Sequence, residues 1–281
     1  MNKQYERFKE IGELAETISN EYFPQIFVDP LKIIHELGLT YSFGHYRDAF
    51  DGLLECKDGK FHIYCNLDRV ETPNSPRARF TLAHELGHYF IDEHRNALLN
   101  GMVPAHSSFC DFESENVIER EADHFAANLI LPKNKFIKAA KKEEIGLQSI
   151  LSISRKFGAS ITSTTISYID EALGKAVVIK WNHNDFQWKR ISNELFNSGL
   201  KKTIESPEKV IRNSPTWKTM NGEAPFPAEF FSGGSTVSAW FPFINEKWKQ
   251  NELLIEEAIT LGRFGMLTFL HVDGETIKAY S

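Results

Sequence analysis

The chain has 281 residues, of which 42% are hydrophobic and 25% charged, a composition typical of a folded globular protein with room for two modest domains. Its net charge of −6 argues against a nucleic-acid-binding surface that extends over the whole chain. No stretch approaches the roughly 20 apolar residues of a membrane span, Met1–Tyr22 lacks a signal-peptide core, and the three cysteines form no CxxC pair, so we expect a cytoplasmic protein without membrane partners.

Two helices are predicted at the start of the chain. Apolar residues recur with a period of about 3.6 over Tyr5–Tyr22, which predicts an amphipathic helix whose face packs in the core. Asp29 followed by Pro30 is a typical helix start, because the carboxylate caps the helix and proline fits its first position. Gly38 is expected to end this second helix.

Short extended runs come next and predict a small sheet. A turn at Asp58–Gly59 joins the last two runs as a hairpin. In the last run apolar residues alternate with His62 and Tyr64, which predicts one buried face. His62 and Tyr64 could therefore face a cleft and contact a substrate, although exposed strand positions are more often merely solvated. The runs are Leu39–Phe43, Gly52–Cys56 and Lys60–Cys65.

The segment Phe80–Ile91, which reads FTLAHELGHYFI, contains the pattern HExxH. On a helix, His84 and His88 share a face, so both imidazoles can point at one zinc ion. Glu85 follows His84 directly and would lie beside the metal, where it can take a proton from water. A chance match in a buried helix is the alternative, and a second motif downstream weakens it.

The helix that carries this pattern has a clear start. Ser75 is a good N-cap, and Pro76 suits the first helical position because its missing N–H costs nothing there. Gly87 inside the helix costs about 1 kcal/mol relative to alanine. We therefore expect a strand or a substrate to approach the helix closely at Gly87.

A second helix is predicted within Ser114–Pro132, which reads SENVIEREADHFAANLILP, with Ser114 as its cap. Glu119 and Asp123 are four residues apart and share a face. Glu119 is the expected third zinc ligand, and Asp123 would accept the second N–H of a ligand histidine. Glu121 is the competing ligand, but it lies about 160–200° around the helix from the other two acids.

HELGH followed by this ExxxD helix and FAANLILP resembles the ImmA/IrrE family of bacterial zinc metallopeptidases. The resemblance implies a zincin-like domain of the gluzincin type, in which His84, His88 and Glu119 hold one zinc ion per chain. It further implies that Glu85 acts as the catalytic base. Better-known members cleave a partner helix-turn-helix transcriptional repressor and so switch on genes.

His94 offers a different ligand set. It stands ten residues after His84, as in the metzincin pattern HExxHxxGxxH, but Ile91 takes the place of the glycine. Without that glycine the helix is expected to continue and to leave His94 on the surface at its end. The segment Arg95–Glu113 then reads as a long loop, in which His106 could donate a hydrogen bond to an oxyanion or could simply be exposed.

Residues 133–174 form a smaller helical part. The run from Leu147 has the order helix, turn at Gly158, cap at Ser160 and second helix, which is similar to a helix-turn-helix. The would-be recognition helix Thr162–Asp170 contains no arginine or lysine to reach bases or phosphates. We therefore expect a structural hairpin or a docking surface, and no specific DNA binding.

The last part, from residue 175, contains all five tryptophans and several predicted strands. Asn251–Leu261 is predicted to be a helix that packs on them. Longer relatives of the family carry a C-terminal domain resembling GAF sensor domains, and this region could be one and bind a small ligand. The predicted strands are Lys175–Lys180, Gln187–Ile191, Thr236–Phe243, Phe264–Val272 and Thr276–Tyr280.

Together these observations predict an α+β chain in three parts: a zincin-like peptidase domain with a small mixed sheet (1–132), a helix-turn-helix-like segment (133–174) and an α/β, GAF-like domain (175–281). The expected function is that of a zinc endopeptidase which cleaves a helix-turn-helix repressor in stress, mobile-element or toxin–antitoxin regulation. The alternative is a DNA-binding or ligand-sensing regulator with a vestigial peptidase site.

Overall fold

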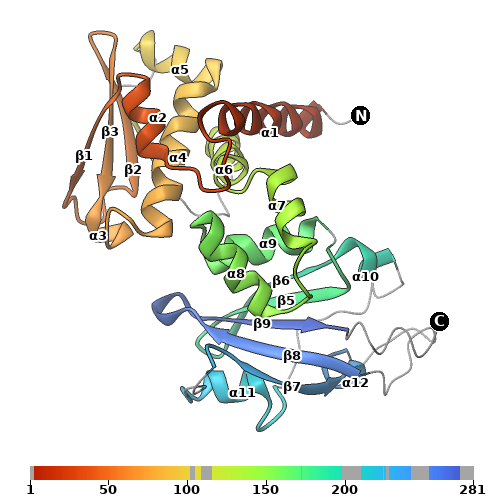
Figure 1. Cartoon of the computed structure of the whole chain (residues 1–281). Coiled ribbons are helices and arrows are strands. Elements are labelled where there is room, and N and C mark those ends of the chain that lie inside the picture. The colour runs from red at the N-terminus through yellow and green to blue at the C-terminus, as the bar shows by residue number, and fades with distance from the viewer. Residues whose placement is uncertain are drawn as a thin grey trace. The chain divides into compact units, whose positions relative to one another are not determined.

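The computed structural model describes residues 3–101, 105–108, 116–171, 173–197, 210–223, 225, 228–241 and 253–272. The chain divides into two compact units: Met1–Phe136 with Ser154–Ser160, and Ile137–Ile153 with Ile161–Ser281. The fold is of the mixed α+β kind, with one sheet in each unit (Figure 1). The division into three parts at residues 132 and 174 stays a prediction.

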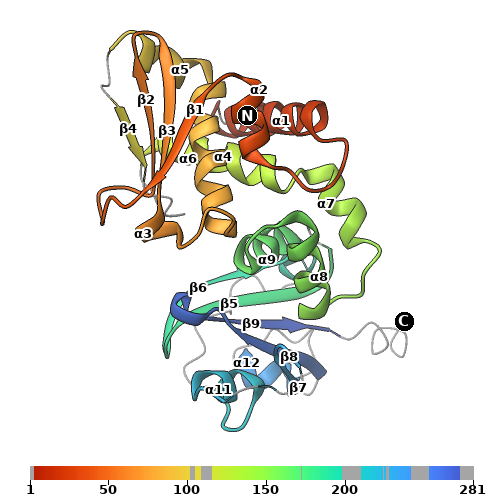
Figure 2. The same cartoon turned by 60° about the vertical axis from the view of Figure 1, so that its left-hand side comes forward.

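The N-terminal unit combines helices with a small mixed sheet. β1 runs parallel to β3, and β2 runs antiparallel to both β3 and β4, in the order β1-β3-β2-β4 (Figure 2). The turn at Asp58 and Gly59, with φ of 52° and 73°, joins β2 to β3 as predicted. The strands are β1 Thr40–Gly44, β2 Gly52–Lys57, β3 Lys60–Asn66 and β4 Ala105–Ser108.

The helices of this unit begin where the sequence signals them. The Asp29 side chain accepts from the backbone N–H of Leu31, and Pro30 follows as the first helical residue. Gly38, with φ of 69°, lies just beyond the end of the same helix. The helices are α1 Lys3–Tyr22, α2 Pro30–Glu36, α3 Leu67–Val70, α4 Pro76–Phe90, α5 Asp92–Leu99 and α6 Val117–Ile130.

One face of the N-terminal sheet is buried against α4. Leu54, Ile63 and Cys65 are fully buried, and the Phe61 ring contacts the Tyr89 ring of α4 with centroids 5.2 Å apart. Because successive side chains of a strand alternate between faces, the residues between them in β3 point to the opposite side. The sheet thus supports α4 on one face and leaves the other open.

The C-terminal unit contains a five-stranded antiparallel sheet in the order β6-β5-β9-β8-β7. A hydrophobic core on one face gathers Val177, Ile179 and Trp181 from β5 with Trp240. The strands are β5 Ala176–Asn182, β6 Asp185–Ile191, β7 Phe231–Thr236, β8 Leu253–Thr260 and β9 Met266–His271. The helices are α9 Ile161–Asp170, α10 Asn193–Asn197, α11 Pro215–Met220, α12 Val237–Trp240 and the 3₁₀ turn η2 Gly262–Phe264.

α7 (Lys133–Ala140) and α8 (Leu147–Phe157) each contribute residues to both units. The predicted succession of helix, turn and helix from Leu147 is present, since Gly158 has φ of 61° between α8 and α9. None of the helices in the described part of the chain combines the length and the apolar character that crossing a bilayer requires.

Two predicted elements of the C-terminal unit are wrong. Asn251–Leu261 was expected to form a helix, but Leu253–Thr260 is strand β8. A strand was expected at Thr236–Phe243, but strand β7 already ends at Thr236, and Val237–Trp240 is helix α12. The predicted strand Thr276–Tyr280 lies outside the described residues.

The error in β8 has a physical cause. The strand lies inside the sheet, between β9 and β7, and is largely buried on both faces, so it lacks the polar alternation of a half-exposed strand. Glu256 resembles a solvated helical charge in the sequence, yet it is fully buried. Its carboxylate accepts from the Thr216 N–H at 2.9 Å and from the Trp240 indole at 3.0 Å, which satisfies it inside the core.

Candidate metal centre

Helix α4 carries the centre and begins as predicted. The Ser75 hydroxyl accepts a hydrogen bond from the backbone N–H of Ala78 at 3.0 Å, and Pro76 is the first helical residue. Further along the same helix, His84, Glu85 and His88 are all fully buried. Burial of three polar residues on one short segment requires partners or a ligand, because an unsatisfied buried polar group is costly.

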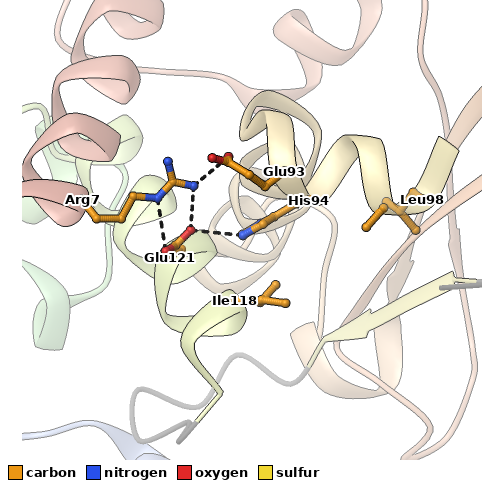
Figure 3. Close-up of a pocket in the computed structure, with 7 residues that line it drawn as sticks. Arg7, Glu93, His94, Leu98, Ile118 and Glu121 are labelled. Carbon is orange, nitrogen blue, oxygen red and sulfur yellow. Dashed lines mark hydrogen bonds and ion pairs between the residues drawn. The ribbon is translucent and has the colours of Figure 1, made fainter. Parts of the chain in front are cut away.

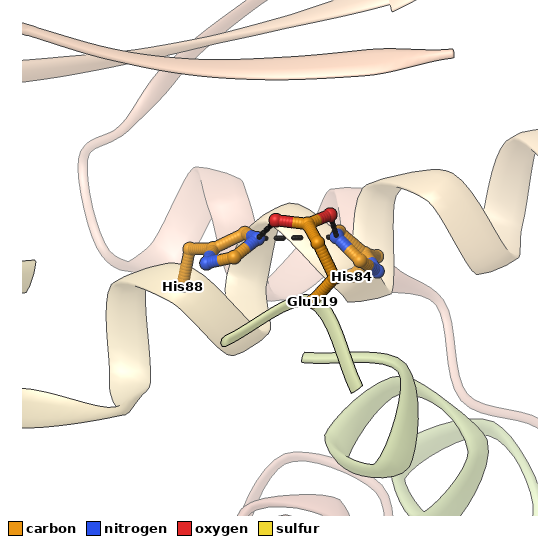
Figure 4. A group of neighbouring side chains, drawn as sticks. All are labelled: His84, His88 and Glu119. Carbon is orange, nitrogen blue, oxygen red and sulfur yellow. Dashed lines mark hydrogen bonds and ion pairs between the residues drawn. The ribbon is translucent and has the colours of Figure 1, made fainter. Parts of the chain in front are cut away.

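His84 and His88 aim their imidazoles at one point, and α6 brings Glu119 to the same place (Figure 4). The two Nε2 atoms lie 3.1 Å apart. The Glu119 carboxylate oxygens lie 3.3 Å from Nε2 of His84 and 3.6 Å from Nε2 of His88. Two imidazole nitrogens and a carboxylate are a donor set that zinc accepts, with room for a fourth ligand.

The orientation of His84 is fixed from behind. Its Nδ1 lies 2.8 Å from Oδ1 of Asp123, the partner expected from the sequence. A carboxylate can only accept, so Nδ1 carries a proton, and Nε2 is the ring nitrogen that faces the cluster. Burial lowers the pKa of His84, but the bonds to Asp123 and Glu119 outweigh it and raise that pKa to about 10. The cluster therefore attracts positive charge, which suits a divalent cation.

A close helix crossing makes this arrangement possible. A Cβ atom at Gly87 would lie 3.1 Å from Cα and 3.2 Å from the carbonyl oxygen of Ala122 on α6. The small residues let the two backbones approach until Glu119 reaches the histidines. The expectation that a strand or a substrate approaches Gly87 is wrong, because helix α6 occupies that position.

Glu85 is held between α4 and the start of β2. A Cβ atom at Gly52 would lie 2.5 Å from Oε1 of Glu85 and 2.6 Å from Cγ2 of Thr81, so β2 can pass only as glycine. Burial raises the pKa of Glu85 to about 8, against the His84 imidazole and the Ser108 hydroxyl, which lower it. A buried carboxyl group with a raised pKa, next to a cation-binding cluster, is a typical candidate for acid–base chemistry.

A comparison with models of known protein families agrees with the motifs seen in the sequence. Residues 71–165 match the family model for the IrrE N-terminal-like domain of peptidase family M78. The chain carries an IrrE N-terminal-like domain. The resemblance to the ImmA/IrrE family seen in the sequence is thereby confirmed, and the matched residues include α4 and α6.

The fold of the whole chain has a relative among solved structures. It is similar to a Mycobacterium tuberculosis transcriptional regulator, with a TM-score of 0.55 and 10% identity, over 96% of this chain and 77% of that one. At this identity the likeness shows the fold alone. No match was found among curated proteins.

The IrrE N-terminal-like domain contains a buried histidine, His94, whose position was predicted wrongly from the sequence. His94 was expected on the surface at the end of a continuing helix, but only 7% of it is exposed. Ile91, itself buried, adopts an extended conformation that ends α4 and begins α5. The acidic first turn of α5, Asp92 and Glu93, is the sequence signal that could have revealed this new helix.

His94 does not join the metal cluster. Its Nδ1 lies 3.2 Å from Nδ1 of His88, the ring nitrogen that faces away from the cluster, and its Nε2 lies 3.2 Å from Oε2 of Glu121. Glu121 thus points away from Glu119, as the helix geometry predicted, and contacts His94 and Arg7. This arrangement disfavours both the metzincin ligand set and Glu121 as a ligand.

The expected substrate contacts His62 and Tyr64 lie elsewhere. They occupy the face of β3 opposite to α4, so the structure does not bring them to the cluster. The His62 ring nitrogens lie 2.7 Å from the Thr40 hydroxyl and 3.0 Å from the Ser42 hydroxyl. Tyr64 donates to Glu55 at 3.0 Å. Both side chains have hydrogen-bond partners within this sheet face, and their contact with a substrate stays a prediction.

Strand β4 replaces part of the loop expected over Arg95–Glu113. It pairs with β2 in the register Leu54↔His106 and Gly52↔Ser108, which brings its end to the point where β2 passes Glu85. The His106 side chain and Cys110 lie outside the described residues, so the role considered for His106 stays a prediction.

Proposed function

We propose that the chain is a zinc-dependent endopeptidase in which His84, His88 and Glu119 hold the metal and Glu85 is the catalytic base. The observation that carries the proposal is the buried cluster of two imidazoles and a carboxylate beside a buried glutamate of raised pKa. Structural zinc sites are usually closed and rich in thiolates, whereas three nitrogen and oxygen donors leave a position open for chemistry.

A zinc ion bound there would supply a Lewis acid that polarises the scissile carbonyl and makes water more acidic. The residues of the chain perform the proton transfers. Glu85 accepts a proton from the water that attacks the scissile carbonyl, once positive charge at the cluster lowers the pKa of Glu85. As the peptide C–N bond breaks, Glu85 passes that proton to the leaving amine. Gly52 and Thr81 confine the Glu85 carboxylate, so the side chain has few conformations besides the one that the reaction needs.

For the substrate we propose a partner helix-turn-helix repressor, whose cleavage would derepress genes. The ImmA/IrrE resemblance supports this choice, and the structural neighbour is a transcriptional regulator. α9, the would-be recognition helix, contains no arginine or lysine, which favours a protein target over DNA. The five-stranded C-terminal sheet is compatible with the proposed GAF-like sensor that would respond to a small ligand.

The test compares wild type with Glu85→Gln, expressed beside the helix-turn-helix repressor encoded nearest to its gene. Glutamine keeps the size of the side chain and removes the base, so cleavage should fall about 10²–10⁴-fold while metal content is unchanged. Glu55→Gln is the matched control, because it alters a carboxylate of strand β2 on the sheet face away from α4. This variant should cleave the repressor normally.

Equal cleavage by wild type and Glu85→Gln would exclude Glu85 as the base. Cleavage by neither, with gene regulation intact in both, would instead identify a regulator whose peptidase site is vestigial.

A further inference from the structure

A chain of polar contacts runs from the back of His88 to the first helix. His94 lies against Nδ1 of His88. Figure 3 shows the other contacts: Glu121 lies against the far nitrogen of His94, and Arg7 donates to Glu121. We infer that His94, Glu121 and Arg7 form a positioning relay that fixes the tautomer and orientation of His88 for metal binding. The inference deepens the proposed function, because it rests on the metal site assigned there.

The direction of the hydrogen bonds follows from the carboxylate at the end of the chain. Glu121 can only accept, so the His94 nitrogen that faces it at 3.2 Å, Nε2, carries a proton. Nδ1 of a neutral His94 is then an acceptor. It receives the Nδ1–H of His88 at 3.2 Å, and the Nε2 lone pair of His88 is left facing His84 and Glu119.

Arg7 sets the position of Glu121. Its Nε donates to Oε1 at 3.2 Å and its Nη2 to Oε2 at 3.1 Å, a two-point contact that fixes the plane of the carboxylate. Nη2 also donates to Glu93 at 2.8 Å. Arg7 comes from α1, outside the residues 71–165 of the family match, so the relay ties the peptidase helices to a part of the chain that the match does not include.

The two ligand histidines are thus supported in different ways. His84 reaches a carboxylate directly, at Asp123, whereas His88 reaches one through an intervening imidazole. His94 and Glu121 are each less than one-tenth exposed, and together with Arg7 they line the pocket drawn in Figure 3. Groups that orient metal-binding histidines typically change metal affinity about 10–100-fold when they are removed.

The experiment measures zinc affinity by competition with a chelating indicator for the full-length chain. We expect His94→Phe, which keeps a ring but removes the acceptor, and Glu121→Gln, which removes the charge, to bind zinc about 10–100-fold more weakly than wild type. Glu93→Gln is the matched control: Glu93 also binds Arg7 but does not touch His94, so its affinity should equal that of wild type.

A readout on His88 itself separates positioning from general structural damage. In zinc-loaded wild type, nitrogen NMR should show a proton on Nδ1 of His88 that exchanges slowly with solvent. In Glu121→Gln this proton should exchange faster, while the metal-free protein stays folded at the temperature of the measurement.

Three results would overturn the inference. An unprotonated Nδ1 of His88 in the zinc-loaded wild type would do so without any variant. Wild-type affinity in both relay variants would exclude the relay and leave the metal site standing. If wild type itself binds no zinc, the proposed function fails, and the relay fails with it.

Discussion

Gly52→Ala tests whether the position of Glu85 is set by the strand that passes it. The added Cβ would lie 2.5 Å from the Glu85 carboxylate oxygen and 2.6 Å from the Thr81 methyl group. Ordinary contacts between such atoms are about 3.5 Å, so the Glu85 carboxylate must move by about 1 Å or the strand must retreat by a similar distance.

A displacement of about 1 Å at a reacting group costs roughly 10²-fold in rate, or about 2.7 kcal/mol of activation free energy. The proposed metal ligands are other residues, His84 and His88 on α4 and Glu119 on α6, so the zinc content should stay at that of wild type. The assay is hydrolysis of a quenched fluorescent peptide selected for cleavage by wild type, with zinc measured in the same samples by elemental analysis.

Gly234→Ala is the matched control, because a Cβ at this strand glycine of the C-terminal sheet meets nothing within 4 Å. It should leave hydrolysis unchanged. Wild-type hydrolysis by a fully zinc-loaded Gly52→Ala would refute the reasoning about Glu85. Loss of zinc from this variant would show that α4 moves, not Glu85 alone.

Two further variants test the frame around the centre. Asp51 is fully buried between Arg69 and Arg77 at 2.7 Å each, and despite the opposing effect of burial these bonds hold its pKa below the ordinary value. Folding thus favours the ionised form of Asp51. The stability that wild type has over Asp51→Asn should therefore be present above about pH 4 and vanish as the pH falls further, which denaturant titrations at several pH values will show. A constant difference in unfolding free energy down to pH 2 would contradict this. Gly87→Ala gains up to about 1 kcal/mol of helix propensity, but the added Cβ crowds the backbone of Ala122 at a cost of about 1–3 kcal/mol. The unfolding free energy should therefore fall by about 1 kcal/mol. A more stable variant would show that α6 can retreat freely.

The helix that carries the candidate metal centre could be predicted from the sequence because its signals are local. Ser75 and Pro76 mark its start, and the spacing of His84 and His88 follows from the helical period alone. Glu119 could be chosen by the same geometry, since Glu121 points to the other side of α6. The second helix was less well bounded: Asn116 caps it, and the predicted cap Ser114 lies outside the described residues.

What could not be predicted depends on partners far apart in the sequence. His94 is buried because Glu121 and, behind it, Arg7 come from two other helices, and no local pattern announces that meeting. The burial of Glu256 could not be predicted either, because the Thr216 and Trp240 donors that permit it lie 40 and 16 residues away in the sequence. Long-range polar contacts, unlike helix caps, leave no periodic signal.

The most direct test of the central claim is anomalous diffraction at the zinc absorption edge from crystals of the purified chain. If the proposed metal site is right, a peak lies about 2.0–2.2 Å from Nε2 of His84, from Nε2 of His88 and from a carboxylate oxygen of Glu119. No peak at these atoms in crystals soaked with zinc, or a peak beside His94 and Glu121 instead, would contradict it.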